Sequence, residues 1–366
     1  MKKRMENLAD GPPKSAPLLK EMFEYSHLLS KWGGESFDTT IELTLDPDRI
    51  IELGHQTKTI GLLPKCFMNV DFSLPADVLE KLNADLTLIE AQNFKNLVET
   101  TDVASLLTDS GIDHLVFKGP VQSHRVYKIW NARRCADIDV LVPFDLFRSA
   151  RDVLNRNGYR CLIEQNNVWW RRHLGELPFK KTSKTSLIID LHHQVQQPGG
   201  PYPKNLNGLF LENVETQFGR HKIKIPNTTH ALLISVIGYG KSVRACTPWL
   251  HYAHEIFTTL QMANEKEKEA IAISAKTHGL LRLYEEASTN AHKIFRGMAG
   301  HDFEKDEYED LLSHAFGSTS HPRFFRTRKL WDWTDGPFPS RLKSFTRGIN
   351  LIISSEIARL NDAKKS

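Results

Sequence analysis

Apolar residues recur every three to four positions along the first third of the chain, which predicts helices ahead of any strand. The predicted helices cover residues 18–32, 47–60 and 75–110, the last as one long helix or as two. At this spacing the apolar side chains share one face of each helix and can pack against a core. We therefore expect an N-terminal helical region over 18–110, preceded by a polar, proline-containing disordered tail over 1–17.

After residue 110 the pattern changes to short apolar runs, several with alternating polarity, which is typical of β-strands. Strands are predicted over 112–117, 137–142 and 159–163 and as a hairpin, 177–181 with 186–195, and helices are predicted over 121–130 and 144–157. This succession indicates a mixed sheet with packed helices, within a core over 111–197. The proline- and glycine-rich stretch 198–203 marks a boundary.

The chain beyond that boundary, 204–366, is predicted to be a C-terminal helical region. Its helices are expected at 229–243, 249–262, 265–277, 280–297 and 342–360. The predicted fold class is therefore α+β, with a mixed-sheet core between two helical regions.

Candidate chemistry appears first in the predicted strand 137–142, where Asp137 and Asp139 alternate with apolar residues. Alternate side chains of a strand share a face, so the two carboxylates would lie side by side and repel unless a cation sits between them. Oxygen ligands of this kind suit Mg²⁺ or Mn²⁺. A solvent-exposed strand end is the alternative interpretation.

Two further features surround this acid pair. Lys118-Gly119 lies at a predicted strand-to-helix junction, where backbone N–H groups and the helix dipole can hold a phosphate. Asp190 lies on a later strand, with His192 two residues beyond it on the same face. A glycine turn, an acid pair and a lone acid are the parts of a two-metal phosphoryl-transfer site.

These residues carry a family resemblance. The segments Phe117-Lys118-Gly119, Tyr127, Arg133, Asp137–Val142 and Asp190-Leu191-His192 resemble, in type and spacing, the nucleotidyltransferases of the DNA polymerase β-like superfamily, within a bacterial, mostly uncharacterised branch. The resemblance extends from about residue 43 to about residue 257, and it implies a polymerase β-like nucleotidyltransferase core. The chain departs from the pattern at Gly238, where the family tends to carry a histidine.

The resemblance also implies roles for single residues. Asp137, Asp139 and Asp190 would be the catalytic metal ligands, and Asp190 would bind the metal that activates the attacking hydroxyl or would take its proton. Lys118-Gly119 replaces the usual Gly-Ser turn of the superfamily. Gly119 would then hold a phosphate and Lys118 would neutralise the triphosphate. Arg133 would hold the leaving pyrophosphate, and His192 would orient Asp190 or contact substrate.

The predicted activity is a metal-dependent transfer of a nucleoside monophosphate from a nucleoside triphosphate, with Mg²⁺ or Mn²⁺ as cofactor and release of pyrophosphate. The acceptor is left open between a small molecule, a protein side chain and a tRNA end. Two alternatives remain at this point: a non-catalytic nucleotide-binding or regulatory module, and a metal-dependent phosphohydrolase.

Composition limits the expected partners, metal sites and location of the protein. The formal net charge is +4, which does not favour general nucleic-acid binding. The four cysteines include no Cys-x-x-Cys pair, so we expect neither a zinc site nor a disulfide framework. The basic start of the chain lacks a following apolar run, and no stretch of about 18 apolar residues occurs, so we expect a cytoplasmic protein with no membrane partner.

Two segments combine aromatic and basic residues. The run 169–173 is interpreted either as a nucleotide-stacking element or as tryptophans that cap the core beside a basic turn. The run 321–329 is interpreted either as a contact for RNA or an acidic partner or as a surface helix.

Overall fold

The computed structural model describes residues 17–33, 43–163, 175–181, 187–195, 203–296 and 305–317, together with Lys329, Asp332, Trp333, Leu342 and Thr346. The predicted aromatic and basic run 169–173, nearly all of 1–17, 198–203 and 321–329, and most of the predicted helix 342–360 lie outside these residues.

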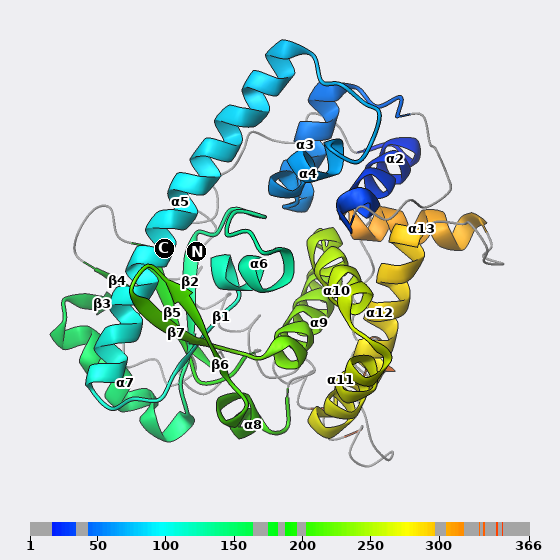
Figure 1. The fold of residues 1–366 in the computed structure, drawn as a ribbon. Helices are drawn as coiled ribbons and strands as arrows, with labels where there is room; N and C mark the ends of the chain where they lie inside the picture. Colours follow the sequence, from blue (N-terminus) through cyan, green and yellow to red (C-terminus); the bar gives the residue numbers. More distant parts are fainter. Residues whose placement is uncertain are drawn as a thin grey trace, which may run out of the picture.

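The N-terminal region is helical, as its apolar spacing predicts. It consists of α2 (Leu19–Ser30), η2 (Lys31–Gly33), α3 (Pro47–Thr57), η3 (Ile60–Leu62), α4 (Leu63–Phe67) and α5 (Ala76–Asp109). The stretch predicted as one helix or two is a single helix of 34 residues. In Figure 1, α5 runs from the neighbourhood of α3 and α4 down to the sheet, so one element joins the two parts.

The central sheet has five strands in the order β1-β2-β5-β4-β3. These are β1 (Leu115–Phe117), β2 (Asp137–Leu141), β3 (Tyr159–Cys161), β4 (Glu176–Lys181) and β5 (Ile188–His192). Strands β2 and β5 pair in parallel, whereas the β1–β2, β4–β5 and β3–β4 pairs are antiparallel. The prediction of an α+β protein with a mixed sheet is confirmed.

One face of the sheet is closed by helices. The core segment also contains α6 (Gly119–Tyr127), η4 (Phe144–Leu146) and α7 (Phe147–Arg156). Apolar residues of α5 and α7 form one buried cluster with Ile138, Val140, Ile189 and Leu191 of β2 and β5. Because side chains alternate along a strand, the acids of β2 and β5 point to the opposite face, toward α6.

The segment after residue 203 begins with structure that the helical prediction missed. After the short α8 (Leu206–Leu211), β6 (Val214–Phe218) and β7 (His221–Ile225) form an antiparallel hairpin. Ile223 and Ile225 of β7 are buried against Val116 and Val121 beside β1. The two strands are short and mostly polar on their exposed side, so their alternation is the only local signal for them.

The remaining C-terminal elements are helices: α9 (Thr228–Ala245), α10 (Leu250–Met262), α11 (Glu265–His278), α12 (Leu281–Arg296) and α13 (Lys305–Ala315). Figure 1 shows α9 and α10 beside α6, with α11, α12 and α13 farther from the sheet. Residues of α2, α9, α10 and α12 share one buried apolar cluster, so helices from both ends of the chain pack together. None of the described helices has the length and apolar character needed to cross a membrane.

Candidate active site

Strand pairing brings the predicted acids together. In the parallel β2–β5 register Asp139 lies opposite Asp190, and Asp137 precedes Asp139 by two residues on the same face. Asp139 is 8% exposed, Asp190 is half-buried and Asp137 is exposed. One ligand atom from each of Asp139, Asp190 and His192 lies within 4.8 Å of the others. The described residues therefore contain a candidate metal centre of two carboxylates and one imidazole, with Asp137 beside it.

Asp139 is fixed by two donors. Lys118 Nζ donates to Asp139 Oδ1 at 2.9 Å, and His192 Nε2 lies 3.0 Å from the same oxygen. Burial alone would raise the pKa of Asp139, but the Lys118 charge and the His192 hydrogen bond outweigh burial and hold this pKa well below its usual range. His192 thus contacts Asp139, and its Nδ1 lies 3.4 Å from Glu176 Oε2.

The other two carboxylates have the opposite tendency. Burial raises the pKa of Asp190 to about 7, and the like charges of Asp139, Asp137 and Glu176 add to this rise. The pKa of Asp137 is also raised, by loss of solvent and then by the charge of Asp139. Groups whose negative charge is disfavoured in this way are stabilised by a bound cation. The oxygen-rich donor set fits Mg²⁺ or Mn²⁺.

The predicted phosphate turn has an unusual backbone. Lys118 has φ 61° and ψ −157°, a conformation that is essentially reserved for glycine. Gly119 follows with φ 60° and begins α6, and a Cβ placed on it would meet no atom within 4 Å. The Cβ side of Gly119 therefore faces open space at the start of α6, and a helix start is where an anion can bind.

Arg133 lies in the loop that leads into β2, and this loop is held by α5. Asn93 Nδ2 donates to the carbonyl oxygens of Trp130 and Arg133, and Asn93 Oδ1 accepts from the backbone N–H of Cys135. The Arg133 Nε atom is buried, lies 3.8 Å from Glu255 Oε1 and has no hydrogen-bond partner in the described part of the chain. Although burial opposes its charge, the neighbouring negative groups raise the pKa of Arg133.

The C-terminal helices add residues that sequence reasoning missed. Glu255 on α10 is 3% exposed and accepts a hydrogen bond from Ser235 Oγ at 2.6 Å. Tyr252, one helical turn earlier, packs its ring on Gly238 of α9 so closely that a Cβ at position 238 would overlap it. A tyrosine ring thus covers Gly238, near which the resemblance leads us to expect a histidine. No local pattern marks Tyr252 or Glu255, because both reach the site only through tertiary packing.

Tyr127, part of the sequence resemblance, has a structural role. Its side chain is buried, and its hydroxyl lies 2.9 Å from His254 Nδ1 on α10. His254 Nε2 lies 3.1 Å from the Leu29 carbonyl oxygen. Since Nε2 must donate to that carbonyl, neutral Nδ1 accepts from Tyr127. This series of hydrogen bonds connects α2, α6 and α10.

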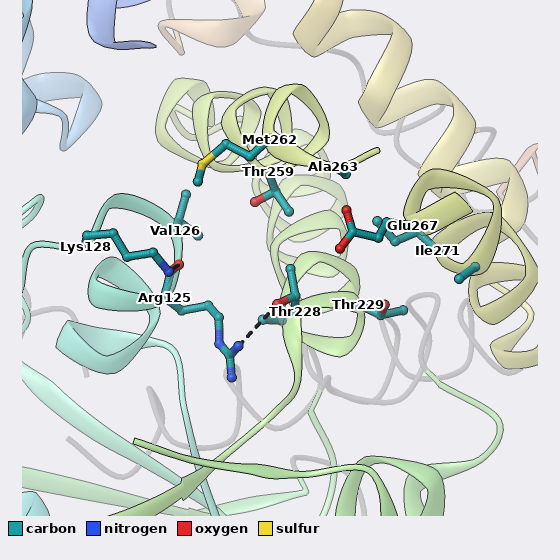
Figure 2. Close-up of a pocket in the computed structure, with 12 residues that line it drawn as sticks. Arg125, Val126, Lys128, Thr228, Thr229, Thr259, Met262, Ala263, Glu267 and Ile271 are labelled. Carbon is teal, nitrogen blue, oxygen red and sulfur yellow. Dashed lines mark hydrogen bonds between the residues drawn. The ribbon is translucent and has the colours of Figure 1, made fainter. Parts of the chain in front are cut away.

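A separate cavity of about 270 Å³ lies at the far end of α6. It is bordered by the ends of α6 and α10 and the starts of α9 and α11, and Arg125 donates to Thr228 Oγ1 at 3.2 Å along its edge (Figure 2). None of the predicted site residues lines it.

The family described as "uncharacterised nucleotidyltransferase" matches residues 44–296. The chain belongs to this family. The resemblance seen in the sequence is therefore confirmed, and Lys118, Asp139 and Asp190 all fall within the matched segment. No curated protein sequence matches this chain.

Two solved structures are similar at low identity. The antibiotic-resistance factor ANT(2'')-Ia is 8% identical, with a TM-score of 0.34, and the match covers 50% of this chain and 91% of that one. An antigenic nucleotidyltransferase-like protein from Paracoccidioides brasiliensis is 11% identical, with a TM-score of 0.37, and the match covers 59% of this chain and 91% of that one.

Proposed function

We propose that this nucleotidyltransferase moves a nucleoside monophosphate from a nucleoside triphosphate to an acceptor hydroxyl or phosphate and releases pyrophosphate. The observation that carries the proposal is the pairing of Asp139 with Asp190 beside an open helix start at Gly119. Carboxylates next to an anion-binding turn are what a metal-dependent phosphoryl-transfer site requires.

Asp137, Asp139 and Asp190 would hold Mg²⁺ or Mn²⁺, with His192 holding Asp139 in place. A bound ion would offset the charge of the phosphates and polarise the bond to the α-phosphorus. Gly119 would give its N–H to a phosphate oxygen, and Lys118 and Arg133 would neutralise the phosphate chain and the leaving pyrophosphate.

Asp190 would take the proton of the acceptor. A carboxylate has two oxygens, so one can bind the metal while the other accepts this proton. The acceptor oxygen would form its bond to the α-phosphorus while the bond from that phosphorus to the bridging oxygen breaks. The proton goes to Asp190 and the electron pair leaves with pyrophosphate.

The acceptor is proposed only by class: a small molecule, a protein side chain or a tRNA end. A cytoplasmic location, where nucleoside triphosphates and Mg²⁺ are at hand, fits the proposed activity.

The test is calorimetric titration of each of the four nucleoside triphosphates, with and without Mg²⁺, into the wild type and into Asp137→Ala/Asp139→Ala. Asp145→Asn is the control, because Asp145 is an exposed acid on η4 outside the site. We expect metal-dependent binding that the double variant loses and the control keeps. Transfer of labelled nucleotide to candidate acceptors is then measured with Asp139→Ala, which should be nearly inactive.

Other outcomes would replace the proposal. Tight binding with no product from any acceptor would favour a non-catalytic nucleotide-binding or regulatory module. Phosphate release without nucleotide addition would favour a metal-dependent phosphohydrolase. Transfer by Asp139→Ala at the wild-type rate would refute the mechanism.

A further inference from the structure

Positive charge gathers at the end of β2 that carries Asp137. Lys58 follows α3, and the next turn packs against the loop that holds Arg133: a Cβ on Gly61 would overlap the carbonyl oxygens of Asn131 and Ala132. Lys58 and Arg133, distant in sequence, therefore lie in one neighbourhood. The Lys58 side chain is exposed, but its surroundings take some solvent from the ammonium; this loss of solvent and then the charges of Arg133 and Lys241 lower its pKa, while Asp137 opposes the shift.

The same side of the site receives Tyr252. It lies one turn before Glu255 on α10, and Glu255 Oε1 lies 3.8 Å from Arg133 Nε. Residues three apart on a helix share a face, so Tyr252 also points toward the site. Its ring packs on Gly238, one turn before Lys241 on α9. Burial raises the pKa of its hydroxyl, the nearby charges of Arg133 and Lys118 oppose this rise, and the hydroxyl forms no hydrogen bond with a described residue.

Within the ranges that the structure describes, the two lysines lack an acidic partner, and the arginine lacks a hydrogen bond at Nε. Lys58 and Lys241 form no salt bridge with any acid among the described residues, and the buried Arg133 Nε has no hydrogen-bond partner there. Arg133 pairs with Glu255, but Lys58 and Lys241 have no such partner in the described part of the chain, so an anion bound beside them would offset the cost of bringing the three cations together.

Charge is distributed unequally over the site. The strongest influences on Asp190 are burial, His192 and the acids Asp139, Asp137 and Glu176. Asp137, by contrast, interacts with Lys118 and Arg133 as well as with Asp139. The polyanionic substrate is therefore favoured on the Asp137 side and the acceptor on the Asp190 side.

We propose that Lys58, Lys241 and Tyr252 join Arg133 in a phosphate-binding wall, which holds the phosphate chain of the donor nucleotide together with the Lys118–Gly119 turn. The identity of the ligand rests on the proposed function. The wall combines a lysine of the N-terminal region, an arginine of the core and two residues of the C-terminal helices. Binding of a phosphate chain would therefore link all three parts of the protein.

The test is titration of inorganic tripolyphosphate, and separately of the Mg²⁺–nucleoside triphosphate, into the wild type, Lys58→Gln, Lys241→Gln and Tyr252→Phe. Tyr252→Phe keeps the ring on Gly238, and both lysines are exposed, so the variants should fold. Lys222→Gln is the control, because Lys222 is an exposed lysine of β7 that pairs with Glu215. Circular dichroism checks the fold of each variant.

We expect each lysine variant to bind both ligands about tenfold more weakly, the lower range for a charge-assisted hydrogen bond, and Tyr252→Phe about fivefold more weakly. Lys222→Gln should bind like the wild type. Unchanged affinity in all three wall variants, with nucleotide binding still dependent on Asp137 and Asp139, would overturn the wall and leave the proposed function standing. Lysine-dependent binding of tripolyphosphate without binding of any nucleotide would support the wall and overturn the proposed function. Wild-type protein that binds neither ligand would overturn both.

Discussion

Lys118 occupies a backbone conformation that glycine adopts without strain and lysine does not. Its φ of 61° and ψ of −157° lie in a region where a Cβ costs about 1–3 kcal/mol. Its side chain makes up for this locally, because Nζ donates to Asp139 Oδ1 at 2.9 Å and lies 4.6 Å from the centre of the Phe117 ring. A strained residue that holds a carboxylate of the site is consistent with selection for chemistry at this position.

The comparison of Lys118→Gly with Lys118→Ala isolates the backbone cost. Both changes remove the ammonium and leave Asp139 with His192 as its donor, so both should destabilise the fold. Alanine keeps the backbone strain, whereas glycine relieves about 1–3 kcal/mol of it. Glycine also gives the unfolded chain more conformational freedom, which lowers the free energy of unfolding by about 0.4–1 kcal/mol. Lys118→Gly should therefore be more stable than Lys118→Ala by about 1–2 kcal/mol.

The assay is urea unfolding of both variants, followed by far-UV circular dichroism and tryptophan fluorescence. Lys81 on α5 is the control position, since it is an exposed lysine inside a helix. There the order should reverse, with glycine about 1 kcal/mol less stable than alanine. Equal stability of the two Lys118 variants, or greater stability of Lys118→Ala, would refute the argument from strain.

Three further predictions concern the parts that support the site. Burial lowers the pKa of His254 to about 4 from the ordinary histidine value of about 6.5, so between these values the unfolded chain binds more protons and stability falls as pH drops from 6.5 toward 4. This amounts to about 2 kcal/mol between pH 7 and pH 5, and urea unfolding of His254→Gln should lose that share of the slope; an unchanged slope would contradict the assignment. Gly61→Ala should lower the free energy of unfolding by about 1–3 kcal/mol, because the new Cβ overlaps the loop that precedes β2. Gly33→Ala is the control and should change it little, because a Cβ there meets only Gln261 Oε1, at 3.7 Å. Asn93→Ala removes three hydrogen bonds to the loop that precedes β2, so it should lower the free energy of unfolding by about 2–4 kcal/mol and weaken nucleotide binding. A calorimetric affinity for nucleotide equal to that of the wild type would show that this loop does not support the site.

The alternation around Asp137 and Asp139 allowed the acid-bearing face of β2 to be predicted, since strand geometry alone decides which side chains share a face. The order of the strands could not be predicted from strand geometry alone. That Asp190 lies opposite Asp139 follows from the parallel β2–β5 register, which depends on the whole sheet. The hairpin of β6 and β7 was missed because its exposed residues resemble those of a polar loop.

The roles of single residues were hardest to predict where partners are distant in sequence. Arg133 was named from the resemblance, but its neighbour Glu255 lies more than a hundred positions later and contacts it only through the packing of α10. His192 was expected near Asp190 because both lie on one strand, yet its shortest contact is with Asp139 on the neighbouring strand. Side-chain reach across strands is not visible in a one-dimensional pattern.

The arrangement of charge also suggests why the site is built from three parts of the chain. A sheet of neighbouring strands places Asp137, Asp139 and Asp190 close together, and loss of solvent, followed by their mutual repulsion, raises the pKa of Asp137 and Asp190. One lysine at the start of α6, Lys118, compensates the charge of Asp139. Further cations must come from elements that approach β2 from outside the sheet, and the loop after α3 and helix α9 are placed to supply them. On this view the flanking helical regions contribute to the chemistry of the core as well as to its stability.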